Sequence, residues 1–483
     1  MNDMIGFSVP RIACVAAATI FCCAHSNEAN AQWEYEFGTD LGVIYSDNIG
    51  LAEPGLEIDD TVLLVIPSIK ITNESDRLEA DIRYRPEGYF YADNSDANDV
   101  FHVVDAQVTG AIVQEALFLF VSAVNYQTIR EPSDPFPTSN LPITDNRVDA
   151  KIFEIRPYWD QDLGFADVLL EAAYVDSEYE QPDEVDPLFN ENNIQKRAYF
   201  TLDNHEKDQG FAWGLEYLFH RFEYTSSVPW DYQRAAVDLG FWVNGTTRLF
   251  GRYGLETDYE NYLDTNLDDN FWELGFQYRP SNRMNLEVAA GKRSFGDSVR
   301  FSMDYQLKRG FTSLSYSEDP ASRGQIGYDY RPIAAVDNLD GFLDRPGAAD
   351  RFVRKRGEWT TNVELARSEL DLRLFYEDRS QRTSDDGTPL EDETYSGVAF
   401  RWAWNLGASS IFRVIFDFAK REFTDEQGFS ESELTSTGVE YEFRFTERFS
   451  TVAHIHHAQE RGDAGDSRDY DENQIGLMLR ARF

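Results

Sequence analysis

Apolar and polar residues alternate along most of this chain, in about 22 segments that are typically about 11 to 15 residues long. In the clearest segment, Val299 to Lys308, the apolar row consists of Val299, Phe301, Met303, Tyr305 and Leu307. A membrane-crossing strand needs about 9 to 11 residues, whereas a strand of a soluble sandwich usually has about 5 or 6. The pattern therefore predicts an all-β fold, a transmembrane antiparallel up-and-down β-barrel of about 22 strands, within a range of about 18 to 24.

Two further segments repeat this division into faces: Trp272 to Tyr278 and Leu370 to Tyr376. In a membrane barrel the apolar row faces lipid and the polar row faces the lumen. The following polar residues are therefore the pore-lining candidates: Glu273, Gln277, Arg300, Asp304, Gln306, Lys308, Asp371, Arg373, Arg480 and Arg482. A lining of this mixed charge suits polar solutes, and an inward aromatic such as Phe375 could stack on sugar rings.

The chain ends on a strand of the same kind. Its last residues alternate Leu477, Leu479 and Phe483 with polar or small residues, and the aromatic is the final residue. An amphipathic strand that ends on Phe resembles the C-terminal assembly signal of bacterial outer-membrane barrels. The resemblance implies a cell outer membrane location and the barrel-assembly machinery and outer-membrane lipid as partners.

The connections between the predicted strands alternate between tight turns and longer polar segments. This alternation is typical of periplasmic turns and extracellular loops, and it places both termini in the periplasm. The exception is Arg293 to Asp297, where a long loop is expected and a short link is found. The longest connection, Glu318 to Arg354, contains three prolines and is the best candidate to fold inward as a constriction. A mobile surface loop is the alternative.

The N-terminal residues 1–31 are predicted to be a secretory signal peptide that is removed. Ile12 to Ala24 form an apolar run too short to span a bilayer, and Ala29-Asn30-Ala31 supplies a small-x-small cleavage site. Residues 32–483 would then form a single barrel. Because the first strand begins at Trp33, we expect no separate plug domain. All three cysteines fall within the removed segment: Cys14, Cys22 and Cys23.

Composition agrees with this class of fold. The formal charge of −42 argues against nucleic acid or anionic lipid as the main partner, because both would be repelled. The carboxylates suit outer loops, either bridged by divalent cations or simply solvated. After the signal segment, no apolar run approaches the roughly 20 residues that a membrane helix needs, which excludes a helical membrane protein.

Motifs of enzymes and cofactor sites are absent from the sequence. It has no G-x-S-x-G elbow, no H-E-x-x-H helix, no phosphate-binding glycine loop and no EF-hand calcium loop. His454 and His456 share one strand face and could hold a metal with a third ligand such as Glu460. Lumen lining is the favoured interpretation. We therefore predict a protein that is not an enzyme, with no catalytic residue, no metal site and no cofactor.

Two segments resemble a known family. Residues Tyr45 to Ile49 (YSDNI), followed by Asp59 to Val62, Ile66 to Ile69 and Tyr84-Arg85-Pro86, resemble the opening of outer-membrane barrels tied to exopolysaccharide loci. The stretch Val299 to Pro320, especially LSYSED, resembles PEP-CTERM-system-associated outer-membrane proteins. The resemblance implies a conduit or export-complex component for an extracellular polysaccharide, with the polymer and periplasmic export proteins as partners. A surface-anchoring scaffold barrel and a general porin for small polar solutes are the alternatives.

Overall fold

The computed structural model describes residues 33–129, 134–179, 192–204, 210–225, 227–257, 270–323, 325, 350–383, 390–425, 428–462 and 469–483. The strands are β1 (Trp33–Ser46), β2 (Asp60–Ser75), β3 (Leu78–Tyr91), β4 (Asp99–Val113), β5 (Leu117–Ile129), β6 (Arg147–Asp162), β7 (Asp167–Tyr179), β8 (Asn193–Asp203), β9 (Gly210–Tyr224), β10 (Trp230–Asn244), β11 (Thr247–Thr257), β12 (Asn270–Ser281), β13 (Met284–Arg293), β14 (Gly296–Leu307), β15 (Gly310–Ser322), β16 (Arg351–Glu364), β17 (Ser368–Thr383), β18 (Glu393–Gly407), β19 (Ser410–Asp425), β20 (Gly428–Arg444), β21 (Phe449–Gly462) and β22 (Tyr470–Arg482). A single short 3₁₀ helix, η1 (Ser95–Ala97), is found within these ranges.

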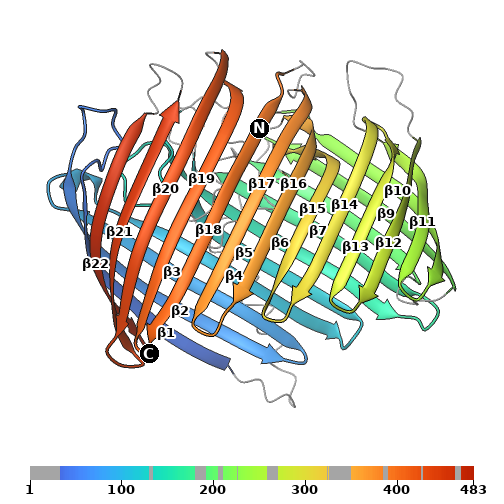
Figure 1. The fold of residues 1–483 in the computed structure, drawn as a ribbon, viewed down its shortest axis with the longest axis horizontal. Coiled ribbons are helices and arrows are strands. Elements are labelled where there is room, and N and C mark those ends of the chain that lie inside the picture. Colours follow the sequence, from blue (N-terminus) through green and yellow to red (C-terminus); the bar gives the residue numbers. More distant parts are fainter. Residues whose placement is uncertain are drawn as a thin grey trace, which may run out of the picture.

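The strands form one closed antiparallel sheet of 22 strands. Each strand pairs with its neighbour in sequence, and β22 returns to pair with β1 from Gly38 opposite Arg482 to Ser46 opposite Gln474. The strands are tilted against the barrel axis (Figure 1). Closure leaves no unpaired sheet edge, which a barrel in lipid requires. The predicted fold class is therefore confirmed. Within the described ranges, no helix is long and apolar enough to cross a membrane.

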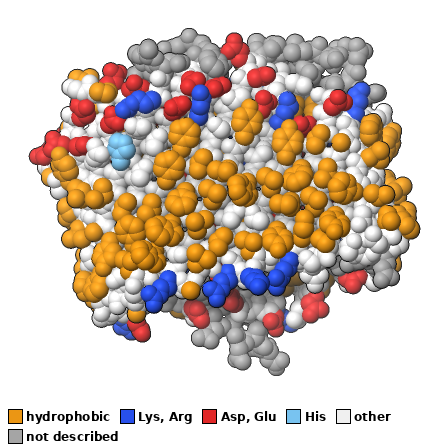
Figure 2. Space-filling model, in the orientation of Figure 1, with side chains coloured by type: hydrophobic (Ala, Val, Ile, Leu, Met, Phe, Trp, Pro, Cys, Tyr) orange, Lys and Arg blue, Asp and Glu red, His pale blue; other side chains and the backbone are white. Residues whose placement is uncertain are grey.

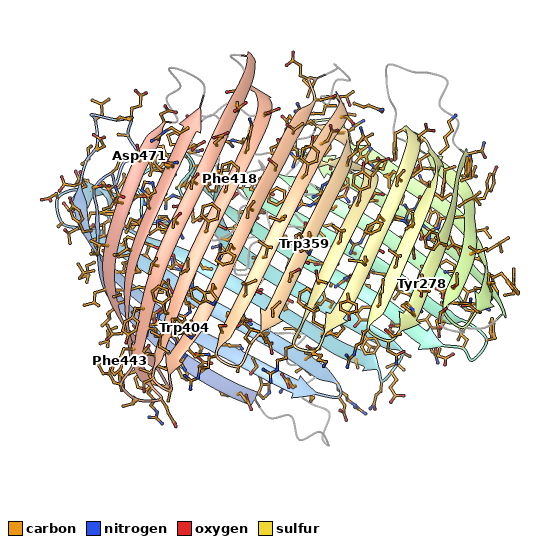
Figure 3. All side chains as sticks on the ribbon, viewed as in Figure 1. Tyr278, Trp359, Trp404, Phe418, Phe443 and Asp471 are labelled. Carbon is orange, nitrogen blue, oxygen red and sulfur yellow. The ribbon has the colours of Figure 1, made fainter. Side chains whose placement is uncertain are left out.

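The two faces of the barrel differ in chemistry. On the face of the barrel that Figure 2 shows, apolar side chains form a broad band, and charged side chains flank the band on both edges. Aromatic residues such as Trp359, Trp404 and Phe443 project outward from their strands (Figure 3) and are more than a third exposed. The inward rows carry ion pairs, for example Arg300 with Glu287 and Arg373 with Glu358. An apolar outer surface is stable only in a nonpolar surrounding, so this band is the part of the barrel that contacts lipid.

The two ends of the barrel also differ. Tight turns connect the strands at one end, and the longer connections lie mostly at the other (Figure 1). The β13–β14 connection is the predicted exception, since β13 ends at Arg293 and β14 begins at Gly296. Both β1 and β22 have their free ends at the turn end, where Phe37 and Phe483 exchange backbone hydrogen bonds of 3.0 and 2.7 Å.

Two boundaries differ from the sequence prediction. The expected loop from Glu318 to Arg354 is partly strand, because β15 continues to Ser322 and β16 begins at Arg351. Glu318 and Pro320 therefore lie within a strand, opposite Lys355 and Val353 of β16. Most of the expected constriction, residues 326–349, lies outside the described residues.

Candidate lumen site

A segment between β5 and β6, residues 134–146, enters the lumen. The backbone N–H of Phe136 donates to Glu460 Oε2 at 2.8 Å, and Tyr470 Oη donates to the carbonyl of Phe136 at 2.7 Å. Glu460 and Tyr470 are fully buried, and they lie opposite each other on the inner faces of β21 and β22. The Phe136 side chain packs in a cluster with Ile129, Phe375, Tyr395, Ala419 and Leu434. One end of the segment is thus bound to the wall formed by β17 to β22.

The other end of this segment is bound to β3 and to the connection after β1. Tyr91 Oη donates to the carbonyl of Leu141 at 2.8 Å, and Asn140 Nδ2 donates to Glu87 Oε2 at 3.0 Å. Leu141 packs in a cluster with Ile44, Ile49, Val62, Leu64, Tyr89 and Tyr91. The segment therefore follows the inner wall from β17 to β3 across the seam between β22 and β1. It narrows the lumen toward the end that carries the longer connections.

The alternation of apolar and polar residues does not predict that residues 134–146 enter the lumen. One feature of the sequence does indicate the inward position of this segment. Phe136, Leu141 and Ile143 are apolar residues in a connection that is otherwise polar and rich in proline. An apolar side chain in an exposed loop contributes no stability. The same side chain packed against the wall is removed from water, which is favourable. The sequence does not show which residue binds Phe136, because Glu460 lies 324 residues away along the chain.

The inner wall is held by arginine–carboxylate clusters. Glu377 on β17 is 1% exposed and accepts from Arg354 at 2.9 Å, Arg356 at 2.6 Å and Arg379 at 2.7 Å. Together, these guanidinium groups offset the cost of burying the carboxylate. Nearby, Glu393 accepts from three groups in the same way: Arg323 at 2.6 Å, Arg382 at 2.9 Å and Tyr395 Oη at 2.5 Å. Charges on this part of the wall are therefore neutralised within the wall.

A second cluster explains how the short β13–β14 connection is held. Arg293, the last residue of β13, contacts Glu256 Oε1 on β11 at 2.5 Å and Asp319 Oδ1 on β15 at 2.8 Å. Tyr232 on β10 and Ser294 also donate to Glu256. Four strands thus meet at one guanidinium and one carboxylate. These contacts fix the end of β13 to β10, β11 and β15.

Most of the pore-lining candidates lie on inward rows. Glu273 and Gln277 are buried, and Arg300 reaches Glu287 at 3.1 Å and Glu273 at 3.8 Å. Asp304 accepts from Ser313 Oγ at 2.7 Å. The Nε2 of Gln306 donates to the carbonyl of Gly310 at 2.9 Å, at the turn end. Lys308 lies in the β14–β15 turn, outside the strand to which it was assigned.

The remaining candidates occupy β17 and β22. Asp371 accepts from Asn362 at 2.7 Å, and Arg373 donates to Glu358 at 3.0 Å. Arg480 lies 3.5 Å and Arg482 2.7 Å from Asp40 on β1, so both arginines bridge the seam on its inner face. On the outer face, the assembly-signal residues Leu477, Leu479 and Phe483 are 58%, 45% and 58% exposed.

Phe375 does face inward, but its ring is not free to stack on a sugar. It is 5% exposed, and the guanidinium carbons of Arg356 and Arg373 lie 5.0 and 5.4 Å from the ring centroid. Phe136 packs with it in the same buried cluster. Its role is to anchor the inward segment.

The histidine pair is placed as expected on one inner face, opposite Gln474 and Gly476 of β22. Glu460, the suggested third ligand, is engaged elsewhere: Arg421 and Ser432 donate to it at 3.1 and 2.6 Å, in addition to Phe136. Across the part of the chain that the structure describes, no group of three His, Cys, Asp or Glu side chains could hold a metal ion.

Shortening the inward segment should widen the pore. Replacing residues 136–143 with a Gly-Ser-Gly bridge removes the contacts of both bound ends, including the hydrogen bond from Ile143 to Ile49, while β5 and β6 keep their partners. We expect a several-fold higher single-channel conductance in planar bilayers. A matched control replaces Ser95-Asp96 of η1, which are exposed at the rim, with Gly-Gly. Equal conductance in both variants would show that residues 134–146 do not limit the pore.

Comparisons with known proteins identify the architecture. No protein-family model matches the chain, and no curated protein sequence matches it. Among solved structures, it is similar to a mutant of the ferric enterobactin receptor PfeA from Pseudomonas aeruginosa, with a TM-score of 0.50 and 10% identity over 94% of this chain and 81% of that one. The siderophore receptor PirA from Acinetobacter baumannii aligns with a TM-score of 0.47 and 8% identity, over 93% of this chain and 80% of that one.

OpdK from Pseudomonas aeruginosa, solved with vanillate, gives a weaker alignment, with a TM-score of 0.35 and 9% identity over 93% of this chain and 98% of that one. At these identities the likeness concerns the fold. The chain has the architecture of a 22-strand outer-membrane barrel, and the comparisons identify no specific family.

Proposed function

We propose that this protein is an outer-membrane conduit, or the barrel component of an export complex, for an extracellular polysaccharide. The observation that carries the proposal is the inner wall, where buried arginines and carboxylates neutralise one another, as around Glu377 and Glu393. Such a wall offers many hydrogen-bonding groups but little net charge to hold an ion. A neutral, hydroxyl-rich polymer could pass it without being trapped. The resemblance of the LSYSED stretch to exosortase-linked barrels supports the choice of cargo.

The proposal includes the setting of the barrel. The apolar band would lie in the outer membrane, with the turn end and both termini in the periplasm, as in other bacterial barrels. Assembly would use the barrel-assembly machinery, which would recognise Leu477, Leu479 and Phe483. Periplasmic export proteins would then meet the turn end. No enzymatic activity, cofactor or metal is part of this proposal.

A porin for small polar solutes is the second candidate, and the inward segment 134–146 favours it. A segment bound at both ends narrows the bore, which suits small molecules better than a moving polymer. A non-transporting scaffold barrel would use the outer connections alone and would need no polar lumen.

Deleting the gene separates these candidates. In the source bacterium, we expect the deletion to reduce secreted polysaccharide, measured as total sugar in the cell-free polymer fraction, while uptake of small sugars stays intact. Complementation with the wild-type gene should restore the polymer. Unchanged polymer together with a large fall in sugar permeability would instead identify a porin, and no change in either would favour the scaffold.

A further inference from the structure

A pocket of about 170 Å³ lies between the inward segment and the wall formed by β19 to β22. It is lined by Phe136, Thr138, Ser139, Ile415, Asp417, Leu434, Ser436, Gly438, Glu440, His454, Ile455, His456 and Gln474. Glu440 and His454 are partly exposed, so the pocket opens toward the rest of the lumen. A water occupies about 30 Å³ in the liquid, so the pocket holds about six waters or one small ring.

Several polar atoms in this pocket have no hydrogen-bond partner. They are Thr138 Oγ1, His454 Nδ1 and His456 Nδ1. Gln474, which is 6% exposed, also lines the pocket from β22, but its side chain is hydrogen-bonded to Glu472. Buried polar groups are almost always paired, because leaving one unpaired costs free energy. These atoms are therefore available to hydrogen-bond the hydroxyl groups of a ligand.

The charges around the pocket argue against an anion. The carboxylate of Asp417 is paired with Arg401 at 2.7 Å, and that of Glu440 with Arg413 at 3.4 Å. Among the described residues that line the pocket, none is Lys or Arg. A phosphate or uronate would therefore meet carboxylates and no unpaired cation. Apolar contact is available from Phe136, Ile415 and Leu434, which suits the C–H face of a ring.

We propose that this pocket is a binding subsite for one neutral sugar ring. Its hydroxyls would be bound by Thr138 and the two histidines, and its apolar face would rest on Phe136. This proposal rests on the proposed role of the barrel as a saccharide conduit, and it assigns the point at which the wall holds the cargo. Because Phe136 belongs to the inward segment, the subsite exists only while that segment is bound to Glu460 and Tyr470.

Gly476 positions one of the histidines. It lies opposite His454 on β22, and a Cβ at this position would collide with the imidazole ring. The ring therefore lies over the glycine. Ser436 Oγ lies 2.9 Å from Nε2 of the neighbouring His456 and holds that ring by a hydrogen bond, which leaves its Nδ1 for a ligand.

Saturation-transfer NMR on the detergent-solubilised protein tests the subsite. Glucose, galactose and mannose serve as neutral probes and glucuronate as the charged analogue. We expect at least one neutral hexose to bind with a millimolar dissociation constant, and glucuronate to bind about tenfold more weakly because of Asp417 and Glu440. Replacing His456 by Leu should weaken hexose binding about tenfold, the effect of one lost hydrogen bond.

The matched control is His457→Leu. His457 is the next residue on β21, but it faces outward and its Nδ1 lies 3.0 Å from Asn473 Oδ1. This variant should bind hexose as the wild type does, and heat-modifiable migration on gels shows that each variant is folded. No binding by any of the three hexoses, stronger binding of glucuronate, or equal loss in both histidine variants would overturn the subsite. If hexose binds but gene deletion leaves the polymer unchanged, the polysaccharide role fails and the subsite stands.

Discussion

Replacing Glu377 by Gln should lower the free energy of unfolding by about 3 to 5 kcal/mol. The carboxylate accepts from Arg354, Arg356 and Arg379, and it is 1% exposed. The amide has the same shape but no charge, so buried guanidinium groups would lose the charge that offsets their desolvation. Urea titration in lipid vesicles, followed by tryptophan fluorescence, measures the change.

Glu369→Gln is the matched control for this variant. Glu369 lies on the inner face of the same strand, but it is exposed and accepts one hydrogen bond of 3.3 Å from Asn362. We expect a loss of less than about 1 kcal/mol, because water solvates either side chain. A similar loss in both variants would mean that the arginine cluster does not stabilise the barrel through its charge.

The sequence predicted the strands well because the barrel imposes a strict period of two. On β12, Trp272 and Leu274 contact lipid while Glu273 faces the lumen, and a shift of one residue would reverse every side chain. The same rule placed Arg480 and Arg482 inside and Leu477 and Leu479 outside. Errors occurred at the strand ends, where the alternation continues into the turn. Lys308 continues the polar row of β14 by spacing but lies in the turn.

The sequence could not predict how the lumen is filled. The inward segment depends on residues brought together by closure of the barrel: Phe136 meets Glu460 and Tyr470, more than 320 positions away. Strand periodicity shows that a residue faces inward, but not which residues it meets across the lumen. Phe375 illustrates this limit, because its inward position was predicted correctly and its covering by Phe136 and two arginines was not.

A charge stabilises the inner face of the barrel but should destabilise its outer face. Met303 lies near the middle of β14 on the outward row, opposite Leu286 of β13 and Leu314 of β15. Replacing it by Arg should cost about 2 to 4 kcal/mol if the site lies near the bilayer midplane, because the guanidinium loses hydration and gains no partner. The measurement is again urea titration in lipid vesicles.

Asp304 provides the internal comparison, since it is the next residue on β14 and faces inward. It is exposed to the lumen and accepts one hydrogen bond, from Ser313. Asp304→Asn should therefore change stability by less than about 1 kcal/mol, while single-channel recording should show altered ion selectivity because one pore charge is lost. Greater destabilisation by Asp304→Asn than by Met303→Arg would show that the two faces of β14 are assigned the wrong way round. If Asp304→Asn behaves as expected but Met303→Arg causes no loss of stability, Met303 lies outside the hydrocarbon region. The apolar band would then lie further along the barrel axis.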